Sequence, residues 1–138
     1  MKLFIDTWGW LALEDRLERF HESSLRCYSE VRAGSGQILT SNFVLDETIT
    51  RLFRRRPFQE AVRFTNGILA SPFVRVEPVT EQRFRQAFSL RQRFADKPKI
   101  SFTDLTTMII MTELKVTKIL TADSHFSQVA LGFQILPS

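Results

Sequence analysis

Lys2-Leu-Phe-Ile-Asp6 opens the chain, and Lys118-Ile-Leu-Thr-Ala-Asp123 returns to the same arrangement near its end. In both stretches a short apolar run, typical of a buried strand, ends at an aspartate. The stretches that lie between them decide how these two strands are joined.

Helical and strand-like stretches alternate along the rest of the chain. Apolar residues recur at helical spacing over 8–13, 17–31, 42–55, 57–69, 80–94 and 101–115, with a short helical turn over 126–129. Further strands are predicted at 37–40, 73–77 and 134–136, and the polar residues 95–99 indicate a loop. Parallel strands need crossover connections, so this alternation predicts one α/β domain over residues 1–138, with a central, mostly parallel five-stranded sheet flanked by helices.

The composition fits one globular domain. With 138 residues, 43% hydrophobic and 25% charged, the chain is long enough for one core and too short to suggest two. Thirteen residues are Phe, and we expect most of them to fill the core because Phe has no polar group. Cys27 is the only cysteine, which excludes an intramolecular disulfide and a thiolate zinc site and indicates a reducing compartment. No signal-peptide core or membrane-length apolar stretch occurs, so we expect a soluble, cytoplasmic protein.

The charge balance is basic. Nineteen basic residues oppose fifteen acidic ones, and the net charge of +4 suits a polyanionic partner, although such an excess also serves simply to prevent self-association. The densest basic cluster comprises Arg51, Arg54, Arg55 and Arg56. It fits a track for phosphates, and it equally fits stabilisation of a helix C-terminus. We expect the arginines of the 80–94 helix to be solvated: Arg83, Arg85, Arg91 and Arg93.

Four acidic residues fall where the predicted fold can gather them. Asp6 and Asp123 follow strands, and ligands of an open parallel sheet collect beyond the carboxyl ends of its strands. Glu47 and Asp104 lie near the starts of helices. Carboxylates are preferred ligands of Mg²⁺ and Mn²⁺, and four acids at one rim would repel one another unless cations neutralised them. The set therefore predicts a divalent-cation site.

Each acid also has a structural interpretation. Asp6 and Asp123 precede helical stretches, where Asp is a favoured N-cap, and Ser101-Phe-Thr-Asp104 resembles a capping box. Glu47 is spaced to pair with Arg51 one turn later. The neighbouring Asp46 competes with Glu47 for the site, because adjacent helical side chains point about 100° apart and periodicity does not choose between them.

Through these residues the chain resembles PIN-domain ribonucleases, and in particular the VapC-like toxins of type II, VapBC-type toxin–antitoxin pairs. Four segments match the family's motifs in order, and the last residues resemble its closing strand: Phe4–Ala12, Ser41–Thr48, Ile100–Asp104, Leu120–Phe126 and Gly132–Pro137. The resemblance implies that Asp6, Glu47, Asp104 and Asp123 hold the metal, and it assigns the second ligand to Glu47. Thr121 resembles a hydroxyl position of the family that orients a ligand or water, although alternation within a buried strand explains it equally well.

The resemblance also implies an activity and partners. The activity is Mg²⁺- or Mn²⁺-dependent hydrolysis of RNA phosphodiester bonds, in which such ions activate water and stabilise charge on the phosphate. The partners are an RNA substrate, a small antitoxin that covers the acidic site, and a second copy of the chain held by apolar surface on the early helices. Trp8 replaces a small residue of the family and serves either to stack a base or to pack in the core. His125 is expected to cap or contact neighbouring backbone, and His21 to lie at the surface.

Other functions remain alternatives. A PIN nuclease of RNA processing that is not a toxin would share all four motifs. A non-catalytic RNA-binding or scaffolding module would be expected to lack one or more of the acids, and all four are present. A receiver-like signalling domain also clusters acids at strand ends, but it needs a lysine after a late strand, whereas Lys118 begins its strand.

Overall fold

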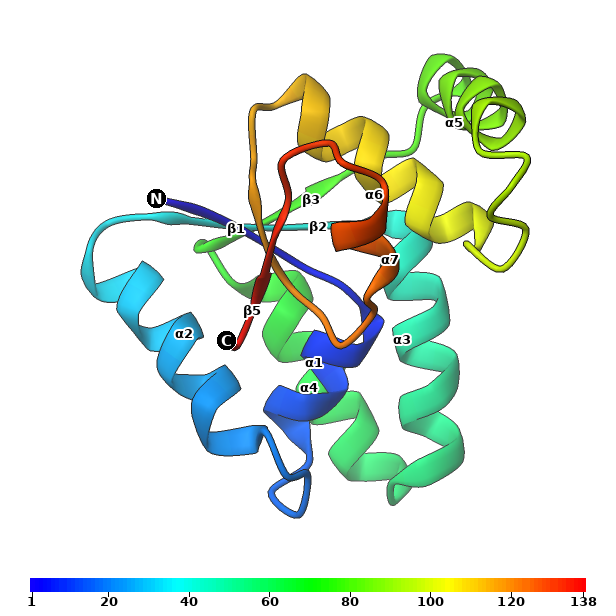
Figure 1. The fold of residues 1–138 in the computed structure, drawn as a ribbon. Coiled ribbons are helices and arrows are strands. Elements are labelled where there is room, and N and C mark those ends of the chain that lie inside the picture. The colour runs from blue at the N-terminus through cyan, green and yellow to red at the C-terminus, as the bar shows by residue number, and fades with distance from the viewer.

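A computed structural model describes residues 1–138 and has seven helices around one five-stranded sheet (Figure 1). The strands are β1 (Lys2–Ile5), β2 (Gln37–Ser41), β3 (Val74–Glu77), β4 (Lys118–Leu120) and β5 (Gln134–Leu136). The helices are α1 (Thr7–Glu14), α2 (His21–Ala33), α3 (Asn42–Arg55), α4 (Phe58–Ala70), α5 (Glu81–Arg93), α6 (Phe102–Glu113) and α7 (His125–Gln128). The predicted α/β class is confirmed, and all strand pairs are parallel.

The order of the strands places a crevice at the middle of the sheet. The order is β3-β2-β1-β4-β5, so the chain builds outward from β1 on one side and then crosses to build on the other side. Ligand sites of open parallel sheets lie at such a reversal, beyond the carboxyl ends of the strands. Here that point lies between β1 and β4, the strands that lead to Asp6 and Asp123.

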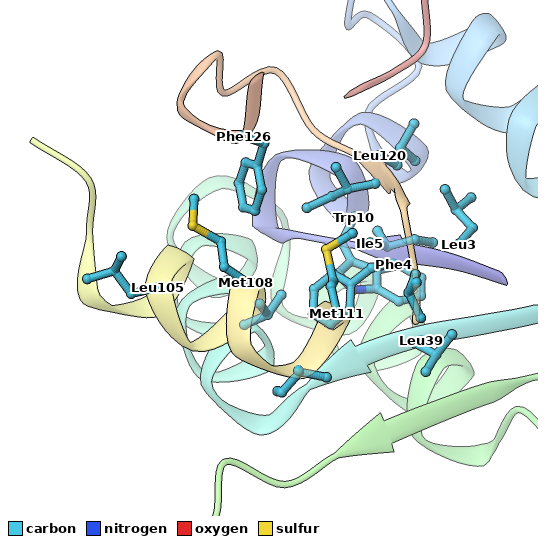
Figure 2. Packing of buried hydrophobic residues seen from close by; sticks show 14 of the residues in the cluster. Leu3, Phe4, Ile5, Trp10, Leu39, Leu105, Met108, Met111, Leu120 and Phe126 are labelled. Carbon is cyan, nitrogen blue, oxygen red and sulfur yellow. The ribbon is translucent and has the colours of Figure 1, made fainter. Parts of the chain in front are cut away.

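The central strand is covered on both faces. Leu3, Phe4 and Ile5 of β1 have no exposed surface. In Figure 1 the helices α1, α3 and α4 gather below the strands, whereas α5 and α6 lie above them. Figure 2 shows Met111 of α6 directed toward Phe4 and Ile5 of β1 and Met108 directed toward Phe126, all within the main hydrophobic core. Burying an apolar side chain of this size is worth about 1.5–3 kcal/mol, so β1 is firmly held.

Polar caps fix where the helices around the crevice begin. Ser41 Oγ accepts a hydrogen bond from the Val44 N–H at 3.1 Å, which starts α3. Ser101 Oγ accepts one from the Asp104 N–H at 3.0 Å, which starts α6. Such caps stabilise a helix by about 1 kcal/mol. The caps thus set the depth at which the acidic residues of these helices meet the crevice.

Helix α2 begins later than the periodic pattern predicts. Leu17, expected near the start of this helix, is 92% exposed, and α2 starts at His21. The Asp15 carboxylate accepts the Leu17 N–H at 2.9 Å, which turns the chain after α1. This local side-chain bond competes successfully with the helix.

The expectation that most phenylalanines fill the core is wrong. Only Phe4, Phe94 and Phe126 are buried. Six others have large exposed fractions: Phe20, Phe53, Phe58, Phe73, Phe84 and Phe88. The interior is filled mainly by aliphatic residues and methionine, and much of the aromatic surface is left on the outer faces of helices.

Two arginines of α5 that were expected to be solvated instead fasten the helix to its surroundings. Arg83 is 8% exposed and donates to Glu77 Oε1 at 3.1 Å and to the Pro78 carbonyl at 2.8 Å, and it also pairs with Glu113. Arg91 donates to the Ile100 carbonyl at 2.7 Å. The Arg91 bond holds the loop that leads into α6. None of the seven helices has the length and apolar character that a membrane span requires.

Candidate metal centre and active site

A cleft of about 450 Å³ lies at the carboxyl ends of β1 and β4. Its wall includes all four predicted acids and Thr121, which come from separate parts of the chain. The lining residues are Asp6, Thr7, Trp8, Val44, Glu47, Arg51, Lys99, Ser101, Thr103, Asp104, Thr121, Ala122 and Asp123. Only three of the thirteen are hydrophobic, so the cleft suits a polar or charged ligand.

Asp6 is held by a bond to each of its carboxylate oxygens. Oδ1 accepts the Gly9 N–H at 2.9 Å and caps α1, while Oδ2 accepts the hydroxyl of Thr121. The N-cap interpretation of Asp6 is therefore confirmed, and the residue still faces the cleft. A Cβ on Gly9 would lie 2.6 Å from the Leu120 carbonyl oxygen, so only glycine lets α1 come this close to β4.

Thr121 joins the two central strand ends. Its Oγ1 donates to Asp6 and accepts the Asp123 N–H at 3.0 Å. Asp123 in turn accepts the His125 N–H through Oδ1 at 2.8 Å, at the start of α7. This chain of bonds fixes the spacing between Asp6 and Asp123, and Thr121 itself is only 2% exposed.

Asp104 and Glu47 complete the acidic wall from α6 and α3. Asp104 uses its N–H for the Ser101 cap, which leaves its carboxylate free to face Asp123. Glu47 lies 3.3 Å from Arg51 Nη2, so the predicted ion pair is present, with both side chains about half exposed. Such an exposed pair contributes little to stability. Asp46 is exposed and does not line the cleft, which answers the question that periodicity left open.

The crowded carboxylates shift each other's protonation. Burial raises the pKa of Asp6 from 3.8 to about 7, and the charges of Asp123 and Glu47 add to this effect, whereas the bonds from Thr121 and Gly9 oppose it. Burial also raises the pKa of Asp104 well above its usual range. The contact of Asp104 with Asp123 and the negative charges of Asp123 and Asp6 raise this pKa further. A cluster that resists ionisation on its own gains stability when a cation binds.

Residues 3–131 match the PIN domain family. The chain belongs to this family. It is 34% identical over 131 residues to the 23S rRNA-specific endonuclease VapC20 of Mycobacterium tuberculosis, covering 95% of both chains. It is 27% identical over 137 residues to the VapC ribonuclease of Archaeoglobus fulgidus, covering 96% of this chain and 83% of that one.

Solved structures agree with this assignment. The crystal structure of Mycobacterium tuberculosis VapC20, described as a sarcin–ricin loop cleaving toxin, has a TM-score of 0.79 and 32% identity, covering 93% of this chain and 95% of that one. Rickettsia felis VapBC2, bound to a DNA fragment from its promoter, has a TM-score of 0.76 over 98% and 97% of the two chains. At 12% identity the second likeness shows the fold alone. The predicted PIN-domain, VapC-like resemblance is thus confirmed.

The residues predicted to contact RNA divide into two groups. Arg51 and Trp8 line the cleft of this PIN domain, and the Trp8 ring also packs on Phe20 with 6.0 Å between centroids. Arg54 and Arg55 are exposed on α3 outside the cleft. The cleft also contains Lys99, which sequence reasoning had placed only in a loop. Its one sequence signal was its position just before the Ile100–Asp104 motif.

The two histidines differ from expectation. The His21 ring is partly buried, with Nδ1 2.8 Å from the Ala12 carbonyl. The His125 ring faces the Asp123 carboxylate instead of forming a hydrogen bond with backbone, and its buried Nδ1 lies 3.0 Å from Asp123 Oδ1 without the geometry of a hydrogen bond.

The residues of the cleft fit a divalent metal ion. Donor atoms of Asp104, Asp123 and His125 all lie within 4.8 Å of one another, and the other carboxylates share the same cleft. Carboxylate oxygens gathered in one polar cleft are suitable ligands for Mg²⁺ or Mn²⁺.

Proposed function

We propose that the chain is a divalent-metal-dependent endoribonuclease and the toxin of a VapBC-type toxin–antitoxin pair. One observation carries the nuclease proposal: four carboxylates from distant segments line a single polar cleft at the topological switch point of a PIN domain. The toxin assignment is supported by relatives named VapC that match almost the whole chain.

The residues of the cleft would have two roles, to hold the metal ion and to orient a carboxylate. Asp6, Glu47, Asp104 and Asp123 would hold Mg²⁺ or Mn²⁺, which when bound activates water and stabilises charge on the scissile phosphate. Thr121 orients the Asp6 carboxylate, because its hydroxyl donates to Oδ2.

The substrate we propose is RNA. Arg51 and Lys99 place positive charge beside the acids, where the flanking phosphates of a nucleic-acid strand would lie. The Trp8 ring offers a surface on which a base can stack, and Arg54 and Arg55 extend the positive surface along α3. Since VapC20 is named for 23S rRNA, ribosomal RNA is the first substrate to test.

The antitoxin partner would cover the acidic cleft. A second hollow of about 800 Å³ lies between α1, α2 and α4, with Trp10, Tyr28 and Phe64 in its wall. Helix α1 lies between the two, because Trp8 lines the cleft and Trp10, about 200° further around the helix, lines the hollow, so one segment of antitoxin would fill both only by passing over α1. An apolar portion of that segment would fill the hollow, and a basic side chain would neutralise the acids.

A homodimer is the remaining part of the proposal. Apolar side chains are exposed on the early helices, as expected, and also on α5. We favour α5 because its Phe84 packs 4.8 Å from Phe102 and 6.3 Å from Phe43, measured between ring centroids, and Phe88 one turn later is 55% exposed. A Phe88→Glu variant should shift to monomer by light scattering, whereas Phe58→Glu on α4 should not. A dimer unaffected by Phe88→Glu would contradict this surface.

The nuclease proposal is tested by cleavage of labelled ribosomal RNA with Mg²⁺ or Mn²⁺, with EDTA as a control. Glu47→Gln should lower the rate by roughly 100-fold or more, because it weakens the hold on the ion that stabilises transition-state charge. Asp46→Asn is the matched control, because Asp46 is the exposed neighbour outside the cleft, and it should keep full activity. Cleavage that persists in EDTA, or in Asp6→Asn, would contradict the metal mechanism.

The toxin assignment needs a separate experiment. Expression of the wild-type chain without a co-produced partner should arrest growth, and Asp6→Asn should not. Harmless wild-type expression, combined with metal-dependent cleavage in vitro, would replace the toxin by a PIN nuclease of RNA processing.

A further inference from the structure

His125 lies beside the acidic cleft, with its ring against the carboxylate of Asp123. It is the first residue of α7, and its backbone N–H donates to Asp123 Oδ1 at 2.8 Å. Its ring Nδ1 lies 3.0 Å from that same oxygen, is buried, and yet forms no hydrogen bond. A buried nitrogen without a hydrogen-bond partner costs free energy, so this position favours the binding of a ligand.

Two carboxylates lie near the His125 ring. Donor atoms of Asp104, Asp123 and His125 all lie within 4.8 Å of one another. Ligand atoms about 2.1 Å from one ion are separated by roughly 3 Å when adjacent and about 4.2 Å when opposite. Small rotations of these side chains would therefore bring all three donors onto one ion. Asp6 lies outside this trio and is already held by Gly9 and Thr121.

We propose that His125 Nδ1 is a direct ligand of the divalent ion, together with Asp104 and Asp123, and that it biases the cleft toward Mn²⁺ over Mg²⁺. The bias follows because Mg²⁺ favours oxygen ligands, whereas imidazole nitrogen suits later first-row ions better. This inference rests on the proposed function, since it concerns the ion that the same cleft would bind.

The backbone supports this role for the imidazole. Asp123 and His125 are two residues apart, and the bond from the His125 N–H to Asp123 holds the turn between them. The ring is 24% exposed, so the ligand atom is buried while the opposite side of the ring reaches solvent. A bound ion would thus contact a nitrogen whose direction is fixed before binding.

The alternative is a protonated imidazole that simply pairs with Asp123. The two interpretations differ in what Mn²⁺ would contact. Pulsed electron paramagnetic resonance on Mn²⁺-loaded protein detects ¹⁴N coupling from a directly bound nitrogen. We expect this coupling in the wild type, and we expect it to change to the ¹⁵N pattern when histidine alone is labelled.

The chain supplies its own control, because it contains only two histidines. His21→Asn should retain the nitrogen coupling, since His21 lies by Ala12 and outside the cleft. His125→Asn should lose it and should weaken Mn²⁺ binding by about tenfold or more in calorimetry, a loss comparable to that from disturbing a metal-bound histidine. Mg²⁺ binding should change much less.

The outcomes separate this inference from the nuclease proposal. Absence of nitrogen coupling in the Mn²⁺-loaded wild type, or equal Mn²⁺ affinity in His125→Asn, would overturn the ligand assignment. If Mg²⁺-dependent RNA cleavage persists in either case, the nuclease proposal stands. If the protein binds neither ion, and Asp104→Asn leaves RNA cleavage unchanged, both proposals fail together.

Discussion

Asp6→Asn should stabilise the metal-free protein, in contrast to most substitutions of buried residues. Asn keeps a side-chain oxygen that can accept the Gly9 N–H, so the N-cap of α1 is retained. What the substitution removes is a buried negative charge that lies near Asp123 and Glu47. The gain in stability should therefore depend on pH in a way that reports the ionisation of Asp6.

The sign and size of this pH-dependent change in stability follow from the raised pKa of Asp6. The folded value is about 7 and the ordinary value is 3.8, so between these values the folded protein binds more protons than the unfolded chain. Its stability then falls as pH rises through this window. Each pKa unit corresponds to 1.36 kcal/mol, which gives a penalty of about 2 kcal/mol at pH 5 and about 4 kcal/mol at pH 8. Removing the carboxylate removes that penalty.

Urea unfolding in EDTA, from pH 5 to pH 8, measures this effect. With a slope of about 1–3 kcal/mol per molar urea, a difference of 2 kcal/mol moves the midpoint by roughly 1 M. Asp46→Asn is the control, because Asp46 is exposed, and its effect should be small and nearly constant. With Mn²⁺ added, the wild type should become the more stable of the two proteins, because the ion stabilises it more than it stabilises Asp6→Asn.

The reasoning would be refuted if Asp6→Asn destabilised the metal-free protein equally at every pH. That result would mean that the Asp6 carboxylate is ordinarily solvated, or that its bonds from Thr121 and Gly9 outweigh its burial. A pH-dependent gain that also appeared in Asp46→Asn would assign the effect to overall charge instead of to the cleft.

Three further predictions concern the supports of the site. Gly9→Ala should cost about 1–3 kcal/mol in urea unfolding and lower RNA cleavage, because the added methyl would press on the Leu120 carbonyl. Thr121→Val should raise the pKa of Asp6 further by removing a bond to its charged form, so Mn²⁺ affinity at pH 7 should fall and recover at higher pH in calorimetry. Arg83→Met should destabilise the protein by about 3 kcal/mol, the lower end for a broken buried ion pair, because buried Glu77 then keeps only the more exposed Arg75 as a partner, and thermal unfolding would show it.

The parts of this structure that could be predicted from sequence depend on local repetition. Short apolar runs that end in an aspartate gave β1 and β4, and the alternation with helices gave the parallel sheet. The bounds of α3 and β5 agree with expectation to the residue. The gathering of four acids in one cleft then followed from topology, since parallel strands present their carboxyl ends at one edge.

The parts that could not be predicted depend on contacts between distant residues. Arg83 is buried because Glu113, thirty residues later, pairs with it, and no local pattern on α5 announces this contact. The exposed Phe84 and Phe88 occupy positions that periodicity alone cannot separate from core positions. His125 Nδ1 was misjudged because its surroundings are set by α6 as well as by its own turn.

The structural and functional interpretations of the acids turned out to be compatible rather than exclusive. One carboxylate oxygen of Asp6 caps α1, and Asp123 accepts an N–H at the start of α7, while both carboxylates still face the cleft. These bonds therefore orient the carboxylates toward the cleft, and the helix N-termini lower the electrostatic cost of holding negative groups close together. It follows that alanine and asparagine substitutions report different things at Asp6: alanine removes both the cap and the charge, and asparagine removes only the charge. Only the asparagine variant separates the placement of the acid from its chemistry.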